Sequence, residues 1–293
     1  SRFPRVTTFA NEGKSVVGYV RQLNSADLAD AEDLLRADPI ANCFIDARVR
    51  WAGLDPWRLG GDAWGYFDDD LLVSLIYVGA NLVPVSTTPA SRAAFADKLR
   101  AMPRRCSSFV GSSAEVLDLW RLLEPAWGPA REVRDDQPLL VMDSDPVVPI
   151  DPQVRLARSA DLDVLIPACI AMFTEEVGVS PVRGGAGSAY RGRIAELVDS
   201  GRAFVRIVDG RVEFKAEVGA ATPEACQVQG VWVAPELRGR GLSEPAMASV
   251  VSMARESISP VVSLYVNSYN HAAMKTYAAV GFRTHGHFAT VLF

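Results

Sequence analysis

The stretch VAPELRGRGLSEP, from Val233 to Pro245, joins glycines to fixed positive charge between a strand-like sequence (QVQGVWV) and a segment with helical spacing. Gly239 and Gly241 allow backbone angles that other residues avoid. The first amides of the following helix have no helical partner and carry a partial positive charge. We therefore predict an anion site suited to a pyrophosphate, with Arg238 and Arg240 at its rim. A tight surface turn with solvated arginines is the alternative.

Size and composition indicate a globular protein with room for two domains. The chain has 293 residues, of which 49% are hydrophobic and 22% charged. Its net charge of −5 argues against general nucleic-acid binding. No apolar run approaches the roughly 20 residues that span a bilayer, and no apolar signal core follows Arg2 and Arg5. We expect a cytoplasmic protein with neither nucleic acid nor membrane as a partner; the oligomeric state is open.

The cysteines and histidines give no metal pattern. The four cysteines are far apart in the sequence and none forms a CxxC pair: Cys43, Cys106, Cys169 and Cys226. We interpret them as buried, reduced thiols. All three histidines, His271, His285 and His287, lie near the C-terminus, away from every cysteine in sequence. We interpret them as surface residues and expect no metal.

A proline-rich stretch divides the chain. DSDPVVPIDPQ has a proline at every third position from Pro146 to Pro152, which favours an extended connector. The predicted domains are 1–142 and 153–293, with a linker at 143–152. SADL occurs in both halves, and a Val-Gly-Ala triplet follows it in each at a similar offset. The order of these matches indicates a duplication.

The predicted elements of the second half give an α/β (α+β) fold. Strands are expected at 153–157, 203–208, 212–220, 225–234, 261–267 and 282–292, and helices at 161–176, 187–200, 243–257 and 270–280. Successive strands followed by helix–strand–helix–strand indicate a mixed, mostly antiparallel central sheet flanked by helices. In the first half we expect two early helices, strands near 64–67 and 71–78, a helix at 90–102 and a strand–helix–strand ending. The counterpart of the glycine turn, LVPVSTTPASRAAF, lacks glycine, so we expect no second anion site.

At this point the second half resembles the GNAT superfamily of N-acetyltransferases. The signature Q/R-x-x-G-x-G/A is matched by Arg238, Gly241 and Ser243. A second landmark in LYVNSYNHAAMKTYAAVGF is matched by Asn270, Ala273, Tyr277 and Gly281-Phe282. The likeness covers about 153–293. For the first half it is architectural only, which implies a tandem protein with a degenerate N-terminal GNAT-like copy.

The resemblance implies acetyl-CoA as co-substrate and assigns roles to residues. Backbone groups of Val231 and Val233 would pair with the pantetheine arm, and Tyr277 would protonate the departing thiolate. The implied cofactor-binding set is Val231, Trp232, Val233, Arg238, Gly239, Arg240, Gly241, Leu242, Ser243, Asn267, Asn270 and Tyr277. Glu244 follows this set and opposes anion binding unless it points away.

The general base is not at the position that relatives use. Where many of them carry a glutamate on the strand before the glycine turn, this chain has Gln227. Glu217 on the preceding strand is the predicted base. Glu175 or Glu176, bound water, and the carboxylate of Phe293 are the alternatives.

The leading hypothesis is an acetyl-CoA-dependent N-acetyltransferase that transfers acetyl directly, in a ternary complex, to a primary amine of a small molecule or protein. The first half would shape the acceptor cleft. A second hypothesis is an acyltransferase of the mycothiol-synthase type. A third is a catalytically silent acyl-CoA-binding sensor, which Gln227 favours and Tyr277 opposes.

Overall fold

The computed structural model describes residues 18–293. Residues 1–17, which include Arg2 and Arg5 and open the predicted N-terminal domain, lie outside the described residues. Within 18–293, no helix is both long and apolar enough to cross a membrane.

The first half of the chain contains six strands and five α-helices within its described part. In order, they are β1 (Tyr19–Gln22), η1 (Ser25–Asp27), α1 (Leu28–Arg36), α2 (Cys43–Ala52), α3 (Pro56–Leu59), β2 (Asp62–Asp68), β3 (Leu71–Val78), β4 (Asn81–Val85), α4 (Pro89–Arg100), β5 (Ser108–Ser112), α5 (Ser113–Trp127) and β6 (Glu132–Met142). The two early helices, the β2–β3 hairpin and α4 match the sequence prediction. The four-residue strand β1 and the four-residue helix α3 were not predicted, because such short elements carry no readable period.

The second half follows the predicted order. It consists of β7 (Arg155–Leu156), η2 (Ser159–Asp161), α6 (Leu162–Val177), η3 (Arg183–Gly185), α7 (Gly187–Asp199), β8 (Ala203–Val208), β9 (Arg211–Ala221), β10 (Ala225–Val233), η4 (Pro235–Leu237), α8 (Ser243–Ser257), β11 (Val261–Tyr265), α9 (His271–Val280) and β12 (Arg283–Leu292). Most boundaries lie within two residues of the predicted ones. The strand predicted at 153–157 is reduced to two residues.

One continuous sheet joins the two halves. Its strand order is β1-β2-β3-β4-β5-β12-β6-β11-β10-β9-β8-β7. Only the pairs β4–β5 and β10–β11 are parallel among the described strands. The predicted fold class, mixed and mostly antiparallel with flanking helices, is confirmed.

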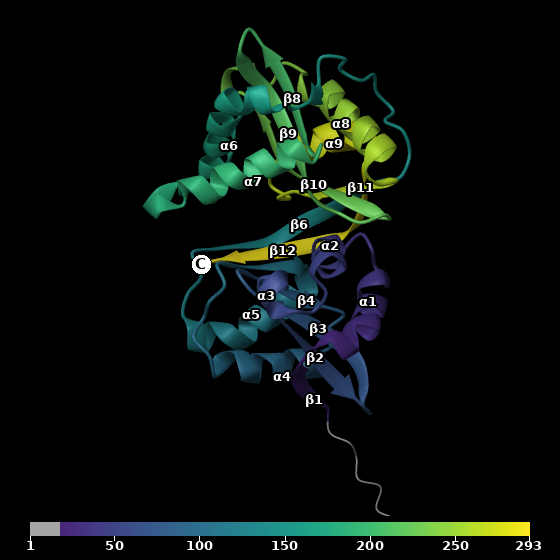
Figure 1. Ribbon diagram of the computed structural model, residues 1–293, viewed down its shortest axis with the longest axis vertical. Coiled ribbons are helices and arrows are strands. Elements are labelled where there is room, and N and C mark those ends of the chain that lie inside the picture. The colour runs from purple at the N-terminus through teal and green to yellow at the C-terminus, as the bar shows by residue number, and fades with distance from the viewer. Residues whose placement is uncertain (1–17) are drawn as a thin grey trace, which may run out of the picture.

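The last strand of each half is exchanged between the halves. β6 ends the first half, yet it pairs with β11 and β12 of the second. β12 ends the chain, yet it pairs with β5 of the first half. Figure 1 shows β6 and β12 side by side across the middle of the molecule. The predicted domains, 1–142 and 153–293, remain a proposal. They divide the sequence, whereas strands β6 and β12 pair with strands of the other half.

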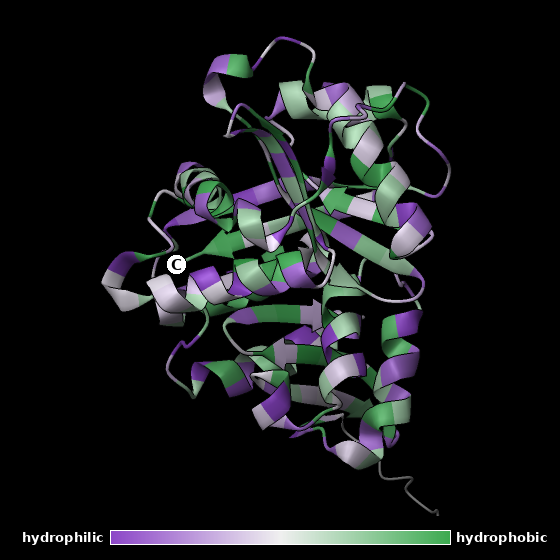
Figure 2. Cartoon of the chain, turned by 45° about the horizontal axis from the view of Figure 1, so that its top comes forward, coloured by the Kyte–Doolittle hydropathy of each residue, from purple (hydrophilic) through white to green (hydrophobic). Residues whose placement is uncertain are grey.

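Helices cover both faces of the sheet. In the second half, α6 and α7 pack on one face and α8 and α9 on the other. Alternation along β8 makes this visible, because Ala203 and Val205 face α6 and α7 whereas Phe204 faces α8. In the first half, α1 and α2 cover one face and α4 and α5 the opposite one. The helices carry both hydrophilic and hydrophobic residues, as expected for helices with one buried side (Figure 2).

The repeated SADL sequence has the same structure in both copies. Each forms a single 3₁₀ turn that leads into a helix. In both, the aspartate accepts two hydrogen bonds from an arginine on the preceding strand: Arg21 to Asp27, at 2.8 Å for each bond, and Arg155 to Asp161, at 2.7 and 3.0 Å. The aspartate also accepts from a backbone amide three residues earlier in each copy. Equivalent residues making equivalent bonds support the internal duplication.

The exchange of β6 and β12 predicts that the halves stay together when the linker is cut. A protease site introduced at the exposed Ser144 and cleaved should leave two fragments that co-elute in size-exclusion chromatography. They should separate only in denaturant, because separation breaks the β5–β12 and β6–β11 ladders. Fragments that elute apart in native buffer would contradict the exchanged pairing.

Candidate functional site

Strands β10 and β11 are paired where they begin and then diverge. They are paired only at residues 225–227 of β10 and 261–263 of β11. β10 continues to Val233 beside β9, and β11 continues to Tyr265 beside β6. The amide of Ala234 donates to Glu213 on β9, so in the alternating ladder the backbone groups of Val233 point to the other side. That edge of β10 has no strand partner among the described residues.

The turn after β10 presents free backbone amides. Gly239 and Gly241 adopt φ of 77° and 76°, in the region that glycine alone adopts readily. A Cβ at either position would meet open space, so conformation rather than crowding requires glycine. Helix α8 has no side-chain cap at its N-terminus. Within residues 18–293, the amides of residues 239–244 donate no hydrogen bond. The predicted anion site is therefore an open row of donors.

Arg238 was predicted to line the anion site, but its backbone amide is not free. Its amide donates to Pro235 O at 3.3 Å, so the free amides begin at Gly239. Its guanidinium donates to both carboxylate oxygens of Glu175, at 2.7 and 2.9 Å, and its Nε donates to Val233 O at 3.0 Å. Arg238 in turn lowers the pKa of Glu175. The turn is thus tied to the C-terminal end of α6.

The remaining predicted residues of the turn have separate surroundings. Ser243 Oγ lies 3.1 Å from Thr276 Oγ1 and links α8 to α9, so its hydroxyl is already engaged. The side chain of Leu242 packs on the core cluster under α8. Arg240 is exposed, and no side-chain hydrogen bond from it is made to residues 18–293.

Tyr277 combines a buried ring with an open hydroxyl. The side chain lies on α9, is 6% exposed, and stacks edge-on against Phe282 with ring centroids 5.7 Å apart. Its hydroxyl makes no hydrogen bond to residues 18–293. Burial raises the pKa of Tyr277 above its ordinary value, and the Glu176 carboxylate adds to the effect. The phenol therefore stays protonated at neutral pH and can donate a proton.

The two predicted asparagines are engaged in holding the loop before α9. Asn270 caps α9, because its side chain accepts from the Ala273 amide at 3.2 Å. Asn267 Oδ1 accepts from Gln137 Nε2 at 3.0 Å, and Gln137 Oε1 accepts from Thr290 at 2.6 Å. Gln137 lies on the exchanged strand β6. Sequence reasoning missed it, since no local pattern links it to residues about 130 positions later.

The carboxylates that could act as the general base differ in whether another side chain already binds them. Glu217, on β9, accepts from the buried Lys215 at 3.0 Å. Glu175 is bound by Arg238. The Glu176 carboxylate has no hydrogen-bond or ion-pair partner among residues 18–293. The residue is exposed to solvent, but protein atoms around the carboxylate remove part of its hydration. Burial raises its pKa above the ordinary value of glutamate, against the opposing pull of Lys215. Gln227 is buried.

Phe293, whose carboxylate the sequence also offered as a base, packs in the first half of the chain. Its ring contacts Phe109 and Trp120. The ten-residue strand β12 separates it from α9 by about 30 Å. A carboxylate at that distance does not reach an acceptor beside Tyr277, so the Phe293 assignment is wrong.

The histidines and cysteines lie as the sequence predicts. All three histidines are exposed, and two of them face aspartates, in the pairs His285–Asp38 and His287–Asp136. The four cysteines are buried free thiols.

Trp232, on β10, has a buried Nε1 that makes no hydrogen bond of normal geometry to residues 18–293. The Glu175 carboxylate is nevertheless close to it, because the Trp232 N–H helps Arg238 to lower the pKa of Glu175.

The equivalent turn of the first half is closed by the protein itself. β4 and β5 also part, after two paired residues each. In the turn that follows, the amide and hydroxyl of Thr87 both donate to the Glu115 carboxylate of α5. Thr88 and Ser91 cap each other's amides. In this turn a carboxylate of the chain itself accepts from the backbone amide and hydroxyl of Thr87.

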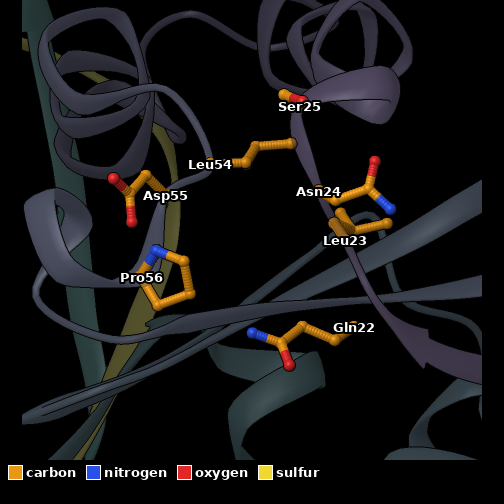
Figure 3. Close-up of a pocket in the computed structure, with 7 residues that line it drawn as sticks. All are labelled: Gln22, Leu23, Asn24, Ser25, Leu54, Asp55 and Pro56. Carbon is orange, nitrogen blue, oxygen red and sulfur yellow. The ribbon is translucent and has the colours of Figure 1, made fainter.

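A surface recess in the first half contains none of the predicted site residues. It lies between the end of β1 and the α2–α3 connection (Figure 3). Its lining is formed by Gln22, Leu23, Asn24, Ser25, Leu54, Asp55 and Pro56. It adds no group to the site around α8.

Comparisons with known proteins found two matching family profiles. The profile of the Acetyltransferase (GNAT) family matches residues 197–282, and that of a domain of unknown function (DUF4081) matches residues 61–165. No curated protein matches the chain in sequence.

Several solved structures share the fold along nearly the whole chain. An acetyltransferase of the GNAT family from Colwellia psychrerythraea is 16% identical, with a TM-score of 0.56, over 94% of this chain and 99% of its own. A GCN5-related N-acetyltransferase from Sphaerobacter thermophilus is 16% identical, with a TM-score of 0.62, over 94% of each chain. A tandem GNAT protein from the clavulanic acid biosynthesis pathway is 16% identical, with a TM-score of 0.53, over 94% of this chain and 98% of its own. Residues 197–282 thus match the GNAT family, and the whole chain shares its fold with GNAT structures that include a tandem GNAT protein. This match and this fold support acyl transfer from acetyl-CoA.

The open glycine turn predicts a loss of binding that can be separated from a loss of stability. Gly241→Ala should lower the free energy of unfolding by about 1–2 kcal/mol, because alanine is strained at this φ. It should also weaken acetyl-CoA binding by turning the row of amides. Calorimetric titration and thermal denaturation measure the two effects.

Gly210→Ala is the matched control. Gly210 has φ of 72° and the same open surroundings, but it lies in the β8–β9 turn. It should lose similar stability and keep its affinity for acetyl-CoA. Equal affinity losses in both variants would show that the turn after β10 is not the anion site.

Proposed function

We propose that this protein is an acetyl-CoA-dependent N-acetyltransferase that transfers acetyl directly to a primary amine of a small molecule or protein in a ternary complex. One observation carries the proposal: the edge of β10 that has no strand partner leads directly into the row of free amides at residues 239–244. An amide-containing arm and a diphosphate are the two ligands that these features suit.

Acetyl-CoA would lie along β10 and end at the turn. Backbone groups of Val231 and Val233 would pair with the pantetheine arm as a strand would. The amides from Gly239 onward would hold the pyrophosphate. In this proposal Arg238 supports the turn through Glu175 rather than touching the phosphate.

Tyr277 would protonate the departing thiolate. The raised pKa keeps the phenol protonated, and the absence of a partner in the described chain leaves the hydroxyl free to donate. A thiolate is a better leaving group when a positioned acid shares its developing charge. The site thus has a donor ready before the substrate arrives.

The acceptor amine must lose a proton. For a lysine-like amine at pH 7, this costs about 4–5 kcal/mol. Glu217 stays a candidate base, but Lys215 competes for its lone pairs. Glu176 is the better-placed candidate, since its carboxylate is free among the described groups and its charge acts on Tyr277. Its raised pKa also makes it a stronger base than an ordinary glutamate.

The first half would shape the acceptor side and position Glu176. Arg134, on the exchanged strand β6, donates to the Glu176 carbonyl, and Arg131 donates to the Val177 carbonyl. Cations at the C-terminal end of a helix are favourable, so these bonds hold the end of α6 in place. The first half would bind no acetyl-CoA of its own, because Glu115 fills its turn.

A silent acyl-CoA-binding sensor is the second candidate. The buried Gln227, at the position where many relatives carry the base, favours it. It would show acetyl-CoA binding without turnover of any amine. The free hydroxyl of Tyr277 favours the enzyme instead.

Replacing the phenol tests the acid. Tyr277→Phe should lower kcat by about 10²–10⁴-fold, the range for a positioned proton donor, and leave the Kd for acetyl-CoA nearly unchanged. Thiol release with a panel of amines measures the rate, and calorimetry measures the affinity. Unchanged turnover would exclude Tyr277 as the acid.

Glu176→Gln tests the base through the pH dependence. Because the pKa of Glu176 is raised, kcat/KM in the wild type should fall as the pH drops through this raised value. The variant should lose this limb and about 10²–10⁴ in rate. Glu175→Gln is the neighbouring comparison; it should keep the limb, since Glu175 pairs with Arg238. A limb that persists in Glu176→Gln would redirect the assignment to Glu217.

A further inference from the structure

A buried ion pair lies under the unpaired stretch of β10. Lys215, on β9, is 0% exposed. Its ammonium donates to Glu217 Oε2 at 3.0 Å and to the carbonyl oxygen of Gly230 at 2.7 Å. A buried ion pair is often no more stable than apolar residues of the same volume. Stability alone therefore does not account for this ion pair. Its distinctive feature is the hydrogen bond from Lys215 to the Gly230 carbonyl.

Gly230 is the point at which β10 is distorted. The β9–β10 register slips between Gln229 and Trp232, with one extra residue on β10. Gly230 adopts φ of 61°. A Cβ there would lie 2.4 Å from Glu217 Oε1 and 2.9 Å from Lys215 Nζ. Only glycine fits both the angle and the space, so the bulge and the ion pair form one unit.

The bond to Lys215 fixes the direction of the next amide. Among the described residues all peptide bonds are trans, so the N–H of Val231 points opposite to the carbonyl of Gly230. It is therefore turned away from Lys215. An ammonium on the carbonyl also polarises the peptide and strengthens the N–H as a donor.

We propose that Lys215 is a positioning residue: it holds the Gly230 carbonyl so that the Val231 N–H meets the thioester carbonyl of the bound acyl-CoA. Glu217 accepts the second hydrogen bond of the Lys215 ammonium and so holds it beside Gly230. The proposal rests on the proposed function, because it requires acyl-CoA along β10. A preorganised donor aimed at the carbonyl stabilises the oxyanion that forms when the amine attacks.

The test replaces the ion pair by apolar residues and observes the carbonyl directly. The Lys215→Met/Glu217→Leu double variant removes the clamp without leaving a buried charge unpaired. The probe is acetyl-CoA labelled with ¹³C at the thioester carbonyl. The carbonyl resonance should move downfield on binding to the wild type, and most of this shift should be lost in the double variant. The Kd for acetyl-CoA should change little. Because Glu217 is also a candidate base, the carbonyl shift and not kcat decides the role of Lys215.

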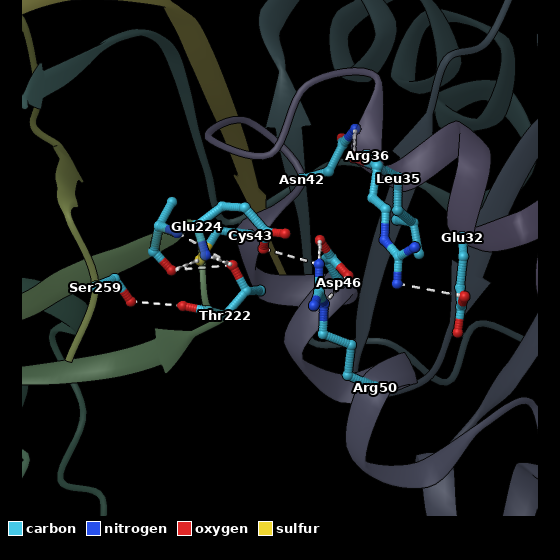
Figure 4. Close-up of polar contacts among 11 residues, drawn as sticks. Glu32, Leu35, Arg36, Asn42, Cys43, Asp46, Arg50, Thr222, Glu224 and Ser259 are labelled. Carbon is cyan, nitrogen blue, oxygen red and sulfur yellow. Dashed lines mark hydrogen bonds and ion pairs between the residues drawn. The ribbon is translucent and has the colours of Figure 1, made fainter.

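A matched control is the buried pair Asp46–Arg50 on α2 (Figure 4). Asp46 is also 0% exposed and accepts from Arg50 Nε at 2.9 Å. The Asp46→Asn variant should keep both the carbonyl shift and kcat. If the double variant does not fold, the wild type decides: the Val231 amide proton should move downfield with acetyl-CoA but not with CoA, which lacks the carbonyl.

The outcomes separate the two proposals. A double variant that folds, binds acetyl-CoA and keeps the full carbonyl shift overturns the role of Lys215 and leaves the acetyltransferase proposal intact. A Val231 amide that responds equally to CoA and acetyl-CoA also overturns it. A wild type that does not bind acetyl-CoA overturns both.

Discussion

The exchange of β6 and β12 is the constraint on which the rest of the structure depends. Each half supplies the strand that completes the other half's sheet, so the twelve strands of residues 18–293 form one sheet. Because β6 pairs with β11 along one edge, β11 is held in place while β10 diverges on its other side. The unpaired edge of β10 therefore depends on a strand from the first half.

The same exchange brings first-half residues to the second-half site. Gln137 and Arg134 both lie on β6; the first holds Asn267 before α9, and the second holds the end of α6. The end of α6 contacts the glycine turn through Glu175 and Arg238, and α9 contacts it through Thr276 and Ser243. The first half thus contributes, through β6, to the geometry around Tyr277 and Glu176.

Local features of the site could be predicted from the sequence. The glycines after β10, the helix that carries Tyr277 and the repeated SADL turns each lie within a short window, where spacing and residue type determine the conformation. The partners of charged groups could not be predicted in this way. Lys215 and Glu217 are two residues apart, but their contact with Gly230 depends on a bulge, and Arg238 and Glu175 meet only through the packing of α6. The exchange of strands leaves no local signal, because either pairing satisfies the same apolar pattern.

Glu115 has a consequence for any attempt to engineer the first half. Its carboxylate already accepts from the amide and hydroxyl of Thr87, so the charge at this turn is supplied from within the chain. Introducing glycine at this turn alone would leave that internal anion in place. A second anion site in this half would therefore need the replacement of Glu115 together with the new glycine.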